Sequence, residues 1–89
     1  MRLFVGNLHI LATETELADL FSRFGKVTSV TIAYDKFVRR SRGYAYVVMD
    51  DAKAARLAMV RLHNTCFMDQ FLVIKESGSN DMPSFGVHY

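Results

Sequence analysis

The sequence predicts an α+β fold: a four-stranded antiparallel sheet with two helices on one face. Three observations support this prediction. Strand-like and helix-like segments follow one another in the order β-α-β-β-α-β. Each helix-like segment has one apolar face, which needs another layer to cover it. The chain has 89 residues, which is enough for one small domain with a modest core.

The first strand and the first helix are predicted within residues 2–25. Residues 2–5 alternate as a strand, with Arg2 and Phe4 on the same side, and a Gly-Asn pair ends it. Residues 13–16, Thr-Glu-Thr-Glu, form a capping box that marks the start of a helix. We expect Gly25 to end this helix as its C-terminal cap. The apolar helix residues have the i, i+3, i+4, i+7 spacing of a buried face: Leu17, Leu20, Phe21 and Phe24.

Two strands, a second helix and a last strand follow. Residues 27–34 and 42–49 predict strands, and residues 35–41 predict the loop between them. Asp50 or Asp51 can cap a helix that runs to about His63, with small residues on its apolar face. Residues 71–76 predict the final strand. This order is the ferredoxin-like, split βαβ topology, in which both helices cover one face of the sheet and leave the other open. We expect one domain at residues 1–76 and a flexible tail at residues 77–89.

The composition argues against disulfides, metal sites, signal peptides and membrane-spanning segments. With the single cysteine Cys66 no internal disulfide can form, which fits a reducing compartment, and three scattered histidines do not make a metal site. The apolar run at the N-terminus is too short for a signal peptide, and no stretch is long enough to span a membrane. We therefore expect a cytoplasmic monomer with no cofactor, no metal and no membrane contact; a bacterial-type or organellar single-domain protein is the alternative. No nucleophile-base pair is present, so we expect no catalysis.

Charge is concentrated in one segment. The net charge is only +2, but residues 36–42 hold four cations and no acid: Lys36, Arg39, Arg40 and Arg42. A local basic cluster on a nearly neutral domain favours a directed contact with a polyanion. The alternative is a basic loop that is merely solvated.

Alternation places aromatic rings on the open face of the predicted sheet. In residues 42–49, Tyr44 and Tyr46 point outward, on the side opposite to Ala45 and Val47. Together with Phe4 they should form a water-exposed cluster on the two central strands. Flat rings stack on nucleobases, and single strands expose the faces of their bases. The alternative is that both tyrosines are simply good strand formers.

Two segments resemble the signatures of the RNA-recognition motif (RRM) family. Arg42–Met49, Arg-Gly-Tyr-Ala-Tyr-Val-Val-Met, resembles the octapeptide RNP1, and Leu3–Leu8, Leu-Phe-Val-Gly-Asn-Leu, resembles the hexapeptide RNP2. The resemblance covers about residues 2–76. It implies that Phe4 and Tyr46 each stack a base and that Tyr44 lies against sugars. It also implies that Arg42 pairs with a phosphate and that Gly43 lets the RNA backbone approach.

The expected ligand is therefore single-stranded RNA, with single-stranded DNA as an alternative. Further cations are expected on phosphates: Arg2, Lys75, Lys36, Arg39 and Arg40. A second hypothesis is a protein-interaction module that uses the helical face. A third is a small phosphatase or metal carrier of the same topology. The residues after the first strand contain no phosphate-binding loop, and paired cysteines are absent, so the third is not favoured.

Two segments depart from the family pattern. Phe37-Val38 places apolar residues in the basic loop, and we expect Phe37 to pack onto its own hairpin; a wedge beside a base is the alternative. Asp69-Gln70 replaces the family's usual Gly-Arg turn and removes a positive charge. The tail contains three rings that could extend the RNA surface if the tail is ordered: Phe85, His88 and Tyr89.

Overall fold

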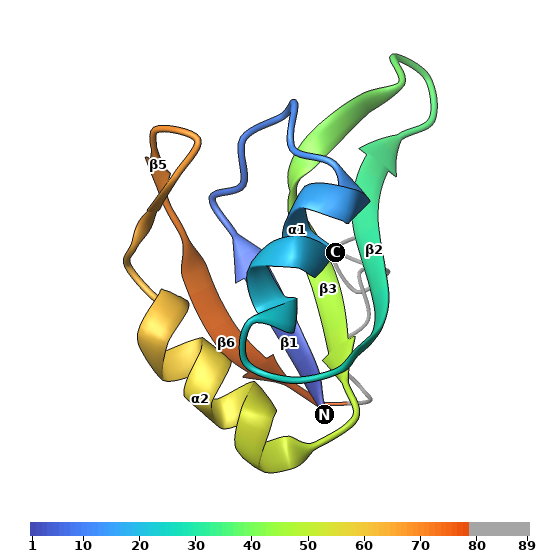
Figure 1. Cartoon of the computed structure of the whole chain (residues 1–89). Helices are drawn as coiled ribbons and strands as arrows, with labels where there is room; N and C mark the ends of the chain where they lie inside the picture. Colours follow the sequence, from blue (N-terminus) through green and yellow to red (C-terminus); the bar gives the residue numbers. More distant parts are fainter. Residues whose placement is uncertain (79–89) are drawn as a thin grey trace.

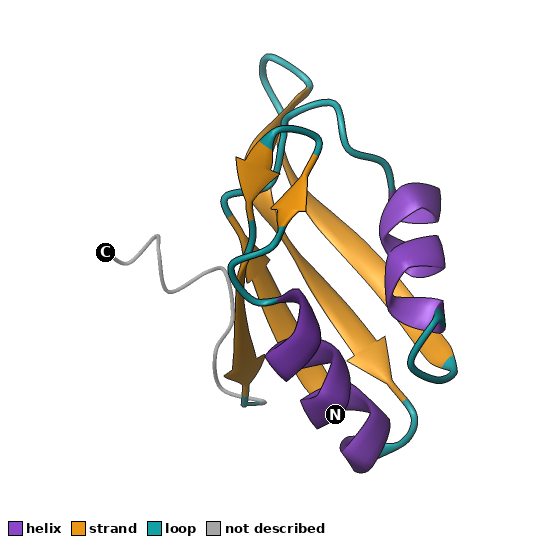
Figure 2. Cartoon of the chain, turned by 60° about the vertical axis from the view of Figure 1, so that its left-hand side comes forward, coloured by secondary structure: helices purple, strands orange, loops and turns teal. Residues whose placement is uncertain are grey.

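The predicted fold class is confirmed. The computed structural model describes residues 1–78; the rings at 85, 88 and 89 lie outside these residues. Four strands form the sheet in the order β2-β3-β1-β6, and every neighbouring pair is antiparallel. Helices α1 (Glu14–Ser22) and α2 (Ala52–Leu62) lie on the same face (Figures 1 and 2). The strands of this sheet are β1 (Arg2–Gly6), β2 (Val27–Asp35), β3 (Arg40–Met49) and β6 (Val73–Ser77).

The predicted final strand is divided into two. Residues 70 and 71 form β5 (Gln70–Phe71), which pairs with β4 (Cys66–Phe67) in a separate hairpin, and only residues 73–77 join the main sheet as β6. Met68 and Asp69 connect β4 to β5, and both have positive φ, 54° and 66°. Positive φ at both central residues is the requirement of a type I′ turn. The sequence indicated a turn at Asp69-Gln70 but not its type, because neither Met68 nor Asp69 is glycine.

The capping box at the start of α1 is confirmed, but the predicted role of Gly25 is wrong. Thr13 Oγ1 accepts a hydrogen bond from the Glu16 backbone N–H at 3.2 Å, and the Thr13 N–H donates to Glu16 Oε1 at 2.9 Å. The helix ends at Ser22, and Gly25 does not have a positive φ. A Cβ at Gly25 would lie 2.6 Å from the Cβ of Ala54. Gly25 is therefore needed for the close approach of α2, and not as a helix cap.

The core fills the space between the sheet and the two helices. The inward residues predicted for β3 are fully buried, and the small residues of α2 let this helix lie close to the strands. Among residues 1–78, neither helix is long and apolar enough to cross a membrane. The largest fully buried side chains are Phe21, Leu3, Leu8, Leu17, Met49, Leu72, Val5 and Val47.

Candidate nucleic-acid interface

Three aromatic rings meet on the face of the sheet opposite to α1 and α2. Phe4 pairs with Tyr46 across β1 and β3, and with Lys75 across β1 and β6. The ring centroids of Phe4 lie 5.8 Å from those of both Tyr44 and Tyr46, and the two tyrosine rings are 6.2 Å apart. The Phe4 and Tyr46 rings meet edge to face, at an interplanar angle of 65°. The register of the strands therefore assembles the predicted ring cluster.

The expected exposure of this cluster is wrong for one ring. Phe4 and Tyr44 are half-buried, but the exposed fraction of Tyr46 is only 8%. Arg2 projects from β1 on the same side as Phe4, and its guanidinium carbon lies 4.4 Å from the centroid of the Tyr46 ring. This is a cation-π contact. Arg2, expected on a phosphate, here lies over the ring expected to stack a base.

Two glycines shape the backbone around the cluster. A Cβ at Gly6 would lie 2.7 Å from a ring carbon of Phe4, so Gly6 leaves the room in which that ring lies over the strand. Gly43 has a φ of +82°, which L side chains rarely adopt. It lies where the register between β2 and β3 shifts, and its carbonyl accepts a hydrogen bond from the Leu8 N–H at 2.9 Å. In this structure the glycine is thus required by the irregular strand.

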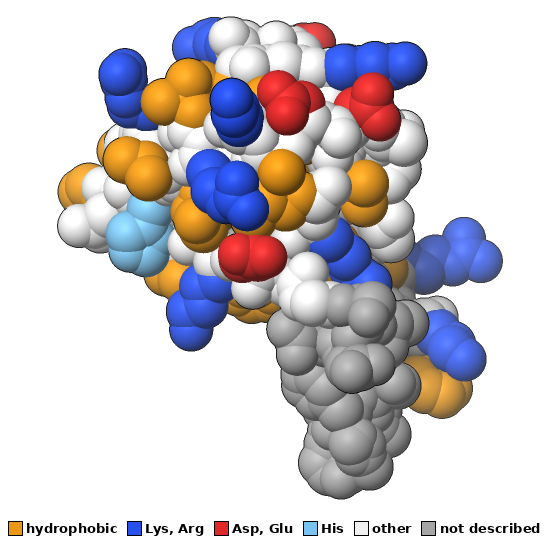
Figure 3. All heavy atoms as spheres, turned by 90° about the horizontal axis from the view of Figure 1, so that it is seen from below, with side chains coloured by type: hydrophobic (Ala, Val, Ile, Leu, Met, Phe, Trp, Pro, Cys, Tyr) orange, Lys and Arg blue, Asp and Glu red, His pale blue; other side chains and the backbone are white. Residues whose placement is uncertain are grey.

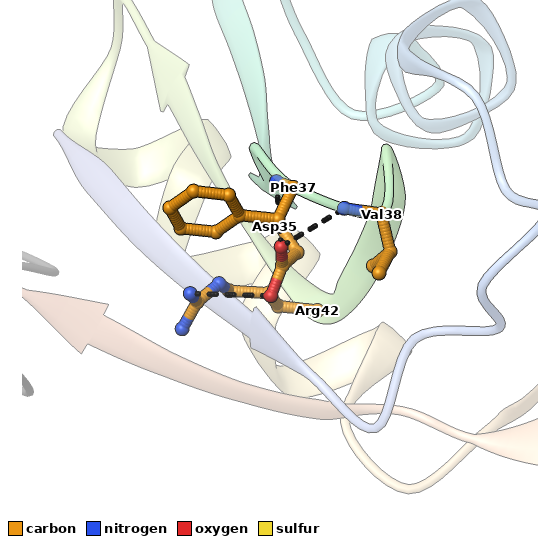
Figure 4. A network of polar contacts seen from close by, with 4 residues as sticks. All are labelled: Asp35, Phe37, Val38 and Arg42. Carbon is orange, nitrogen blue, oxygen red and sulfur yellow. Dashed lines mark hydrogen bonds and ion pairs between the residues drawn. The ribbon is translucent and has the colours of Figure 1, made fainter.

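One carboxylate organises the hairpin between β2 and β3. Asp35 Oδ1 accepts hydrogen bonds from the N–H groups of Phe37 (2.8 Å) and Val38 (3.2 Å), and the Asp35 carbonyl accepts from the Arg39 N–H at 2.9 Å. These bonds shorten the predicted loop to residues 36–39. The same carboxylate lies 3.7 Å from the Arg42 guanidinium (Figure 4). The Phe37 and Val38 N–H groups, and then the Arg42 charge, hold the pKa of Asp35 below its ordinary value.

The predicted cations are in different situations. Arg42 forms the one ion pair found within residues 1–78, with more than half of its side chain exposed. The side chains of Lys36, Arg39 and Arg40 are exposed on the hairpin. Lys75 is exposed beside Phe4. The structure thus assembles two groups: the rings with Arg2 and Lys75, and the basic hairpin with Arg42 at its base.

The expectation that Phe37 packs onto its own hairpin is wrong. Its exposed fraction is 94%, and that of Val38 is 63%. The Phe37 ring and the Arg42 guanidinium project to the same side of the hairpin, and Val38 projects to the other (Figure 4).

Sequence reasoning missed the amide pair that joins the β4-β5 hairpin to the end of β1. Gln70 Nε2 donates to the Asn7 carbonyl at 2.9 Å, and Asn7 Nδ2 donates to the Phe71 carbonyl at 2.8 Å. Gln70 therefore has a structural role in the turn that departs from the family pattern. Sequence reasoning also missed Asp35; an Asp at the first position of a turn was the available signal. Within residues 1–78, no group of metal-ligating side chains could hold an ion.

Comparison with known proteins gives a consistent result. The family model described as "RNA recognition motif" matches residues 3–73. The chain is 38% identical over 63 residues to "Probable RNA-binding protein 23" of Homo sapiens. The aligned stretch covers 71% of this chain and 14% of that protein. It is 45% identical over 58 residues to "RNA-binding protein CP33, chloroplastic" of Arabidopsis thaliana, covering 65% of this chain and 18% of that protein. The chain thus spans less than a fifth of each of these two relatives.

Solved structures agree with the fold. The crystal structure of RNA binding protein PG1 superposes with a TM-score of 0.84 at 36% identity, covering 86% of this chain and 93% of that one. The RNA15 RRM superposes with the same TM-score at 26% identity, covering 90% of this chain and 92% of that one.

Proposed function

This chain belongs to the RNA recognition motif family, and from that premise we propose that it binds single-stranded RNA on the open face of its sheet. The observation that carries the proposal is the cluster of Phe4, Tyr44 and Tyr46, within 5.8–6.2 Å of one another on the two central strands. Both helices found within residues 1–78 lie on the opposite face (Figure 2). The family consists of binding domains without catalytic activity, so the domain is not an enzyme.

Stacking on the rings provides the main contact. Bases of a single strand stack on Phe4 and Tyr46, each contact contributing about 1–3 kcal/mol, and Tyr44 lies against the sugars. A base reaches the Tyr46 ring when the Arg2 guanidinium leaves it, which costs about 0.5–1 kcal/mol of cation-π energy. The guanidinium then turns from the ring toward a phosphate. Two or three such contacts, reduced by the cost of ordering, correspond to an affinity of about 1 μM.

The basic side chains hold the phosphates. Lys75 lies beside the rings, and Arg42 with the exposed hairpin cations Lys36, Arg39 and Arg40 extends the positive surface. About three to five phosphate contacts predict a slope of log affinity against log salt of roughly −2 to −3.5. The domain binds as a monomer, and single-stranded DNA, which shares the bases and phosphates, binds at the same face. Chloroplast proteins among the relatives support the organellar alternative to the cytoplasmic location that the sequence suggested.

The experiment measures single-stranded RNA binding by fluorescence anisotropy with a random-sequence pool and compares Phe4→Ala and Tyr46→Ala with the parent. Each variant should lose about 1–3 kcal/mol of binding. Tyr46→Ala should also lower the melting temperature, because the ring is buried and contacts Phe4, Tyr44 and Arg2. Val60→Ala, an exposed apolar truncation on α2, is the control. If Phe4→Ala binds like Val60→Ala, the sheet face is not the binding surface.

The protein-interaction alternative has less support. The exposed apolar residues of α2, Leu57 and Val60, lie among Lys53, Arg56 and Arg61. Figure 3 shows the molecule from below the view of Figure 1. Charged side chains separate the apolar ones there, so no continuous apolar patch forms in that view. NMR shift mapping with RNA separates the two readings: shifts at Phe4 and Tyr44 support RNA on the sheet, and shifts confined to the helices contradict it.

A further inference from the structure

One apolar side chain stands outside the proposed interface. Phe37, at the tip of the β2-β3 hairpin (residues 36–39, the hairpin tip), is 94% exposed. A single exposed apolar residue needs no explanation by itself. Three further features of its surroundings point to a ligand: the order of the turn, the charges beside it and the direction in which the ring projects.

The turn that carries Phe37 is hydrogen-bonded and not free. The Phe37 N–H donates to Asp35 Oδ1 at 2.8 Å, the Val38 N–H donates to the same oxygen at 3.2 Å, and the Arg39 N–H closes the turn on the Asp35 carbonyl. The backbone of Phe37 is therefore already ordered before any ligand arrives. Contacts made from an ordered backbone give up less conformational entropy on binding.

The charges beside Phe37 select the kind of ligand. The cations Lys36, Arg39 and Arg40 are exposed on the same short hairpin, and within residues 1–78 none of them has an acidic partner. An aromatic ring among cations matches a nucleobase flanked by phosphates, which is the combination found in single-strand binding grooves. An apolar peptide would leave these cations without partners.

The direction of the ring connects the hairpin to the sheet. The Phe37 ring and the Arg42 guanidinium project to the same side (Figure 4), and Arg42 lies two residues before Tyr44 on β3. A strand of RNA that leaves the rings along β3 therefore reaches Arg42 first and Phe37 next.

We propose that Phe37 is a further base-stacking residue, so that RNA bound on the sheet continues onto the hairpin tip. The inference rests on the proposed function and adds a second subsite to it. Tyr46 lies opposite Thr31 and Arg40 opposite Asp35, so four residues of β2 measure the way from the Tyr46 ring to the hairpin tip, roughly 13 Å at about 3.3 Å per residue. A stacked nucleic-acid strand rises about 3.4 Å per nucleotide, so about four nucleotides separate the two subsites. The ligand is thus a single strand of about 8 nucleotides or more, and a strand of about 4 occupies the sheet alone.

The experiment compares random-sequence RNA pools of about 4 and about 10 nucleotides by fluorescence anisotropy. Phe37→Ala should weaken binding of the longer pool by about 5- to 150-fold, the range for one stacking contact, and leave the shorter pool unchanged. Phe37→Tyr should restore binding, and Phe37→Leu should not, because leucine keeps the apolar surface without a flat ring. Val38→Ala, which truncates an exposed side chain on the opposite side of the hairpin, is the matched control.

The outcomes separate this inference from the proposed function. If Phe37→Ala binds the longer pool like Val38→Ala while Phe4→Ala loses binding, the second subsite is wrong and the sheet platform stands. If Phe4→Ala binds both pools like the parent, the platform itself is wrong. Retained binding of the longer pool by Phe37→Leu would also overturn a stacking role. Vesicles of anionic phospholipid test a membrane surface as the alternative ligand of the hairpin tip. If Phe37→Ala weakens vesicle binding and does not change RNA binding, the hairpin tip is a membrane contact and the stacking proposal is wrong.

Discussion

Replacing Asp35 by asparagine should strengthen RNA binding. The carboxylate lies 3.7 Å from the Arg42 guanidinium and holds a cation that the proposed function places on a phosphate. Asparagine keeps a side-chain oxygen that can accept from the N–H groups of Phe37 and Val38, so the turn should persist. The substitution removes the negative charge alone.

The size of the effect follows from counterion release. Each phosphate contact on a single strand contributes about 0.7 to the slope of log affinity against log salt, so one freed cation makes the slope steeper by about 0.7. At 0.1 M salt this corresponds to a gain of at most about 5-fold in affinity. Between 50 and 200 mM salt the gain should shrink by about 2.6-fold.

A salt titration of RNA binding measures both quantities. Asp19→Asn changes the net charge by the same amount on the exposed face of α1 and serves as the matched control. In an Arg42→Gln background, Asp35→Asn should lose most of its effect, because the cation that it frees is absent. Equal affinities and slopes for Asp35→Asn and Asp19→Asn would refute the idea that Asp35 competes with phosphate. A full gain in the Arg42→Gln background would refute the assignment to Arg42.

Two further predictions concern the same hairpin. Gly43→Ala forces an L side chain to a φ of +82°, at a cost of about 1–2 kcal/mol, so the melting temperature should fall by about 4–15 °C; an unchanged melting curve would mean that the strand relaxes without cost. The pKa of Asp35 is held below its ordinary value. The carboxylate therefore stabilises the turn fully at any pH above that ordinary value, and this stabilisation is lost as the pH falls through the lowered pKa. The amide resonances of Phe37 and Val38 should therefore be constant from pH 5 to pH 8 and shift only in more acidic solution, about pH 4 and below; a shift near neutral pH would contradict the assignment.

The elements of the fold could be predicted because they depend on local sequence. The capping box at Thr13 starts α1 where expected, and alternation in β3 assigns Ala45 and Val47 to the core correctly. One error arose because a residue's role depends on a distant partner. Gly25 was expected as a helix cap, whereas its lack of a side chain matters for Ala54, which is 29 positions away in the sequence.

The same distinction holds for the candidate site. Strand alternation and the RNP-like segments were enough to select Phe4, Tyr44 and Tyr46, and the register of β1 and β3 brings them together. Their exposure was not predictable, because it depends on side chains from other parts of the chain, such as Arg2 of β1, which lies over the Tyr46 ring.

The sequence by itself determined the order of the elements, the faces of each strand and the types of residue that line the open face. These follow from periodicities of two and 3.6 residues, which are local properties of the chain. Only the tertiary structure decided that Arg42 is paired with Asp35, that Tyr46 is buried and that Phe37 stands free of its hairpin. Each of these depends on distances between side chains of different residues, which arise when strands pair and turns close. For this reason the cluster of aromatic rings on β1 and β3 was predictable, whereas the exposure of its rings and the pairing of the nearby charges were not.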